Sequence, residues 1–328
     1  MAESLINSIA RLRVIERDLL TKDTVGRLVS APGYEECLKI LSESGYGAAA
    51  PAEGDEIEAL TEAQLLKTYA LVSELLPKRH APAAEVFRMR HDVLNIKLLY
   101  KLRMMQGDLE GAKLDFGGIY DEAKLKAAIS KGDYSMLPDE LSSALEELDV
   151  ATYKKPDPKL VSCRIDSAYM RFAQSIRSAF TREYFGALAD FTNLLSIARG
   201  FGEEYYLPGG EYGKDRLNAI SDALKTEPDK APDLIKGALE TGALKEKLRE
   251  AAAEFIRTSH TSAIERARDE YLIGLASEGH SDIDSPAPIV GYLLAREREA
   301  EVIRLLLTAK RSGIPVSALE ERSLALYG

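Results

Sequence analysis

Apolar positions recur at helical spacing along most of this chain, whereas the alternating patterns typical of β-strands are hard to find. Two apolar stripes are the clearest, with spacings of three or four residues: Leu94, Leu98, Leu102 and Met105, and then Leu188, Phe191, Leu195 and Ala198. Residues at such intervals share one side of a helix, so each stripe predicts an amphipathic helix. Ala, Leu, Glu, Lys and Arg dominate the sequence, and these good helix formers favour an all-α fold.

Both predicted helices carry the same pair of polar residues. Asp92 is followed three positions later by Asn95, and Asp190 is followed at the same interval by Asn193. The two asparagines lie 98 residues apart. A looser third copy begins at Glu299 and leads, like the others, through an aliphatic run to basic residues and a glycine. A period of about 100 residues is closer to a small domain than to a solenoid repeat.

Paired glycines at 117–118 and 209–210 follow the first two copies at the same place in the pattern. Glycine tolerates a positive φ, so each pair predicts a turn ahead of a new helix. The recurring helices and turns together divide the chain into three similar helical units, residues 1–111, 112–206 and 207–328.

The repeated acid–asparagine pair has two interpretations. Residues three apart on a helix share a face, so Asp92 with Asn95, and Asp190 with Asn193, would bridge neighbouring helices by hydrogen bonds. This structural role is favoured, because buried polar groups are usually hydrogen-bonded. The alternative is a polar binding site made of a carboxamide and a carboxylate.

The sequence is poor in recognisable chemistry. Its four histidines and two cysteines show no metal-ligand spacing, and no phosphate-binding Gly-x-x-x-x-Gly-Lys-Ser/Thr loop is present. We therefore expect no catalytic residue, cofactor or metal site in this chain. The formal net charge of −10 argues against nucleic acid or anionic lipid as the main partner. No apolar run reaches the roughly 18 residues needed to span a bilayer.

The third copy carries a resemblance to a known family, in these motif residues: Tyr292, Glu297, Glu299, Arg304, Lys310 and Gly313. Their order resembles the C-terminal signature of the C subunit of prokaryotic V-type (A-type) ATPases, the equivalent of the d subunit of the eukaryotic V-ATPase. The segments 10–14 and 90–99 look like other landmarks of that family, so the resemblance covers the whole chain. Val302 departs from the pattern, because the family often has asparagine there.

The resemblance implies an all-helical, funnel-like protein of three similar subdomains in a pseudo-threefold arrangement. It also implies a non-catalytic rotor subunit of a machine that transports H⁺ or Na⁺ and hydrolyses or makes ATP. Such a protein sits peripherally on the cytoplasmic side of the membrane. There it joins the central-shaft subunits to the proteolipid membrane ring, and it meets the membrane only through that ring.

Two other classes of function stay open from the sequence. One is a helical scaffold or adaptor of a different cytoplasmic complex. The other is an all-α enzyme whose site is assembled from scattered acids such as Asp92, Asp166 and Asp190. The enzyme interpretation is the weakest, since no nucleophile, base and oxyanion donor can be recognised together.

Overall fold

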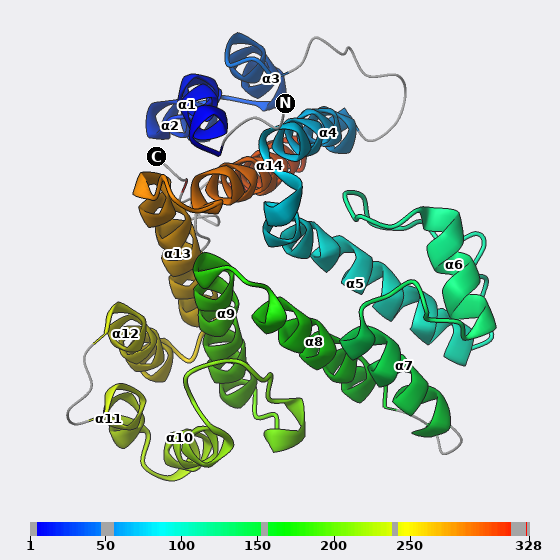
Figure 1. The fold of residues 1–328 in the computed structure, drawn as a ribbon. Helices are drawn as coiled ribbons and strands as arrows, with labels where there is room; N and C mark the ends of the chain where they lie inside the picture. The colour runs from blue at the N-terminus through cyan, green and yellow to red at the C-terminus, as the bar shows by residue number, and fades with distance from the viewer. Residues whose placement is uncertain (1–4, 47–55, 152–156, 238–241, 316–325, 327–328) are drawn as a thin grey trace. The chain divides into compact units, whose positions relative to one another are not determined.

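The computed structural model describes residues 5–46, 56–151, 157–237, 242–315 and 326. In these ranges every regular element is a helix, which confirms the expected all-α fold (Figure 1). The chain divides into two compact units. The first joins residues 1–84 to residues 269–328, and the second is the continuous stretch 85–268. The expected three-repeat division and its funnel-like arrangement stay predictions.

The first unit brings the two ends of the chain together. Its helices are α1 (Leu5–Ile15), α2 (Lys22–Ser30), α3 (Tyr34–Glu43), α4 (Glu56–Leu75) and α14 (Ala287–Arg311). Every residue of α14 from Ala287 to Glu297 is buried, so this helix lies inside the unit rather than on its surface. It packs mainly against α4 and also contacts α1 and α3 (Figure 1).

Apolar side chains of α2, of the residues just before it, of α3 and of α14 form one core in this unit. Its central members are Leu20, Val25, Leu28, Cys37, Ile40, Leu41, Val302, Ile303, Leu306 and Leu307. Cys37 is a buried free thiol. The core thus joins residues near position 30 to residues near position 305.

The second unit holds most of the remaining helices. They are α5 (Pro82–Met104, which begins in the first unit), α6 (Glu122–Lys131), α7 (Asp139–Ala151), α8 (Pro158–Ser175), α9 (Ala179–Ala198), α10 (Lys214–Thr226), α11 (Ala231–Lys236), α12 (Ala243–Thr258) and α13 (Ser262–Glu278, which ends in the first unit). Helix α8 packs between α7 and α9, and α9 also contacts α10 and α12 (Figure 1).

The apolar stripe expected on α5 is not its buried face. Leu94, Leu98 and Met105 are 50%, 40% and 69% exposed. The buried face instead carries Val93, Ile96, Leu99 and Tyr100. Helix α5 has apolar residues on two sides, so spacing alone selected the wrong one. On α9 the expected stripe fits better, because Phe191 and Leu195 are buried.

Two adjacent leucines test this assignment of faces. Leu99→Ala should lower the free energy of unfolding by about 2–5 kcal/mol, because it leaves a cavity in a closed core. Leu98→Ala removes the same atoms from a partly exposed position and should cost less than about 1 kcal/mol. Urea denaturation of both variants measures the difference, and equal losses would contradict the assignment.

Candidate functional site

The Asp92 carboxylate binds the loop that follows its own helix. The backbone N–H groups of Ile119 and Tyr120 donate to it over 2.7 and 3.3 Å. Gly117 adopts a φ of +104°, and a Cβ on Gly118 would overlap Asp92 Oδ1. The glycine pair is therefore required by the acid, since only a residue without a side chain lets the loop approach this closely.

Asp190 repeats this arrangement on α9. The N–H groups of Glu211 and Tyr212 donate to it over 2.9 and 3.3 Å. Gly209 has a φ of +94°, and a Cβ on Gly210 would overlap Asp190 Oδ1. The expected turn at each glycine pair is thus seen, and its role is to bring two successive amides to a buried carboxylate.

The paired asparagines also bind loop backbone, not a neighbouring helix. Asn95 donates to the carbonyl of Asp115 over 2.9 Å and accepts its N–H over 2.6 Å. Asn193 does the same with Leu207, over 2.9 and 2.7 Å. Each carboxamide therefore pairs with both backbone groups of one residue. The helix-to-helix bridges expected from the sequence are not what these side chains make.

The third copy forms a buried polar network in the first unit. Glu299 accepts hydrogen bonds from the backbone N–H of Leu20, from Tyr46 Oη at 2.7 Å and from Arg296 at 2.9 Å. Arg296 also donates to the hydroxyl oxygen of Tyr292 over 3.0 Å. Arg304 lies apart from this network and donates to Thr61 Oγ1 over 2.8 Å.

Burial raises the pKa of all three motif acids. For Asp190 the pKa rises from 3.8 to about 6, although the two backbone N–H groups oppose the change. Burial likewise raises the pKa of Asp92 and of Glu299, and the Arg296 guanidinium opposes it at Glu299. Raised carboxyl pKa values also occur at catalytic sites, so the space around these groups has to be considered.

The space around the motif acids differs, since Asp190 lies beside almost none, whereas Glu299 is among the residues that line a hollow of about 700 Å³ in the first unit. The cavity beside Asp190 holds only about 10 Å³, close to the space of one water molecule. Asp166, the third acid of the enzyme interpretation, is paired with Lys97 Nζ at 2.7 Å instead of joining Asp92 or Asp190. Across the described ranges, no group of three or more His, Cys, Asp or Glu side chains is placed to hold a metal ion.

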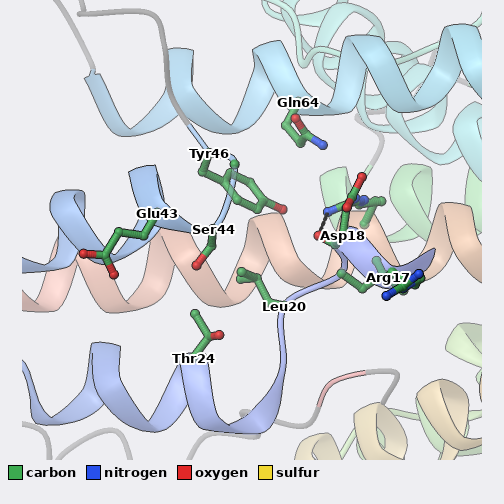
Figure 2. A pocket seen from close by; sticks show the side chains of 11 residues that line it. Arg17, Asp18, Leu20, Thr24, Glu43, Ser44, Tyr46 and Gln64 are labelled. Atoms are coloured by element: carbon green, nitrogen blue, oxygen red, sulfur yellow. Dashed lines mark hydrogen bonds between the residues drawn. The ribbon is translucent and has the colours of Figure 1, made fainter. Parts of the chain in front are cut away.

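A second hollow lies in the first unit and was not found from the sequence. It has a volume of about 630 Å³ and is lined by Arg17, Asp18, Leu19, Leu20, Thr24, Glu43, Ser44, Gly45, Tyr46, Gln64 and Arg296. Figure 2 shows Gln64, Tyr46, Leu20 and Thr24 around it. No histidine or cysteine is among these lining residues, and the two arginines are balanced by two acids. The hollow therefore presents polar groups that suit binding of a polar ligand.

The chain is similar to known proteins along its whole length. The family model of the ATP synthase (C/AC39) subunit matches residues 8–322. The C subunit of the V-type sodium ATPase of Enterococcus hirae is 23% identical over 331 residues, which cover 96% of this chain and 97% of that protein. The C subunit of the A-type ATP synthase of Thermococcus kodakarensis is 25% identical over 341 residues, covering 95% and 88%. That of Haloferax volcanii is 24% identical over 344 residues, covering 97% of each.

The asparagine contacts predict a graded loss of stability. Asn193→Ala leaves both backbone groups of the half-buried Leu207 without their partner, which should cost about 1–3 kcal/mol of unfolding free energy. Asn95→Ala should cost less, because Asp115 is exposed and water can replace the side chain. Asn218→Ala, which removes an exposed contact with Glu203, is the matched control. Thermal denaturation measures all three, and an Asn193→Ala variant as stable as the control would contradict a structural role.

The raised pKa of Asp190 predicts a pH dependence of stability. The folded protein holds this proton up to about pH 6 and the unfolded chain only to about pH 4, so the stability it contributes is lost as pH rises between these values. The unfolding free energy of the wild type relative to Asp190→Asn should therefore fall by about 2 kcal/mol from pH 4 to pH 7. Urea denaturation across this range measures it. Asn193→Ala changes no titrating group and should give a constant difference, and a constant difference for Asp190→Asn would contradict the pKa shift.

Proposed function

Because this chain belongs to the ATP synthase (C/AC39) subunit family, we propose that it is a non-catalytic rotor subunit of a V-type or A-type ATPase. In this role it couples the central shaft to the proteolipid membrane ring during rotary transport of H⁺ or Na⁺. The observation that carries the proposal is the match, over almost the full chain, to the C subunits of both a V-type sodium ATPase and A-type ATP synthases. The place of work is the cytoplasmic side of the membrane, where the protein is peripheral.

The physical properties of the two units suit a part that transmits torque. Densely packed helical cores have low compressibility and pass strain on instead of absorbing it. The acids and asparagines of α5 and α9 fix the loops that follow these helices, which limits independent loop motion. Within the described ranges, no helix is both long and apolar enough to cross a bilayer.

The exposed stripe formed by Leu94 and Leu98 on α5, and by Met105 directly after its end, is our candidate contact with a partner protein. The repeat itself does not require apolar residues there, because the positions 98 residues after the two leucines are Thr192 and Ser196. An exposed apolar stripe at helical spacing fits the apolar face of another helix. In the rotor this partner helix belongs to the shaft.

The proposal is tested by affinity purification of the tagged protein from mild-detergent extracts of its own cells' membranes. Mass spectrometry should then identify proteolipid ring and central-shaft subunits among the captured proteins. A protein that remains in the soluble fraction and captures neither would contradict the rotor role. The helical scaffold of another cytoplasmic complex would then be the better interpretation.

A double variant tests the stripe within the same experiment. Leu94→Glu with Leu98→Glu should reduce recovery of shaft subunits at least tenfold, because it places charge on the contact. The melting temperature should change by only a few degrees, since both side chains are exposed. Val150→Glu on α7, where the valine is also exposed, is the control and should leave recovery unchanged. Full recovery with the double variant would remove the stripe as a contact while leaving the wild-type result to decide the rotor role.

A further inference from the structure

The backbone that binds the third motif acid comes from the opposite end of the chain. Asp92 and Asp190 accept N–H groups from residues that follow them by about 20 to 30 positions. Glu299 instead accepts the N–H of Leu20, which precedes it by 279 positions. In the third copy, therefore, the acid and the amide that it binds come from opposite ends of the chain.

The acid contacts share one place in the local structure. Tyr120 is the residue before Asp121, whose side chain accepts the N–H of Lys124 and caps α6. Leu20 is the residue before Thr21, whose side chain accepts the N–H of Thr24 and caps α2. Tyr212 likewise stands one residue before Gly213, the N-cap of α10. In all three copies the motif acid holds the amide just ahead of the next helix.

A second contact, between a basic side chain and a backbone carbonyl, also occurs at corresponding positions in the first and third copies. Arg103 on α5 donates to the carbonyl oxygen of Ile129 on α6 over 2.7 Å. Lys310 on α14 donates to the carbonyl oxygen of Val29 on α2 over 2.7 Å. From the first copy to the third, the acid and the base both move by 207 positions, from 92 to 299 and from 103 to 310. Both backbone partners move by 100, from 120 to 20 and from 129 to 29.

The same correspondence of positions explains why the third copy has Val302 where the other two copies have an asparagine. The residue that corresponds to Asp115, the partner of Asn95, is Ile15 at the end of α1. Its N–H lies within a helix and is already paired there. An asparagine at position 302 would have no loop amide to bind, and Val302 instead lies buried in the core of the first unit.

We infer that residues 19–31 are the closing element of the third repeat and act as a clasp on α14. These residues lie near the start of the chain. They bind α14 in the same way that α6 and the turn before it bind α5. The third repeat is therefore completed by contacts between residues 19–31 and α14, which lie near the two ends of the sequence. Release of the clasp would uncover the buried apolar side of α14 around Val302, Ile303 and Leu306. The inference is independent of the proposed rotor role.

Hydrogen–deuterium exchange of the full-length protein, read by mass spectrometry, tests the clasp. Lys310→Met should raise exchange in α2 at least tenfold and leave α6 unchanged, because it removes the contact with the α2 backbone. Arg103→Met is the matched variant and should do the reverse. If Lys310→Met leaves α2 as protected as in the wild type, or deprotects α2 and α6 equally, the clasp is wrong.

A conservative variant keeps the test decisive if Lys310→Met fails to fold. Lys310→Arg places at this position the residue type that the first copy uses at Arg103. It should retain wild-type exchange in α2, because a guanidinium also donates to a backbone carbonyl. Loss of α2 protection in a folded Lys310→Arg variant would overturn the equivalence of the two contacts.

Discussion

The fold depends on buried carboxylates that replace water as the partner of loop amides. Asp92, Asp190 and Glu299 each lie on a long helix and accept the backbone N–H that stands just ahead of another helix. A buried amide without a partner is costly, and so is a buried carboxylate, but each satisfies the other. Burial raises the pKa of all three acids, and the hydrogen bonds to their carboxylates oppose this rise. These contacts fix the position of each helix relative to the segment whose backbone it binds.

The residues of this motif were visible in the sequence, but their partners were not. Aspartate and asparagine recur at a fixed interval, and that interval identifies Asp92, Asn95, Asp190 and Asn193 without a structure. Their partners are backbone groups, which any residue supplies, so no side-chain pattern marks them. The helical class followed from periodicity, whereas the buried face of α5 did not, because its exposed and buried leucines are equally apolar. The polar hollow of the first unit could not be predicted from the sequence, because its lining residues come from distant parts of the chain, from position 17 to position 296.

The third copy differs from the other two in the charge that it buries. Arg296 donates to Glu299, to Tyr292 and to the backbone carbonyl of Asp18, so each side of this ion pair is hydrogen-bonded. The corresponding positions in the other copies are the apolar Met89 and Ala187. Removing a charged pair from water cancels much of its attraction, so the pair is a poor source of stability. It does penalise any arrangement that leaves either charge unpaired, and it therefore favours one placement of residues 18–20 against α14.

The discontinuous first unit has a consequence for the order of events during synthesis. Residues 85–268 form a continuous unit, and all of it is synthesised before α14, which begins at Ala287. Helices α1 to α4 emerge first, yet the segment that completes their core lies beyond position 286. Their apolar faces therefore stay exposed, or covered by other proteins, while the whole second unit is translated. This takes on the order of tens of seconds. The earliest part of the chain to be made is thus among the last to be finished.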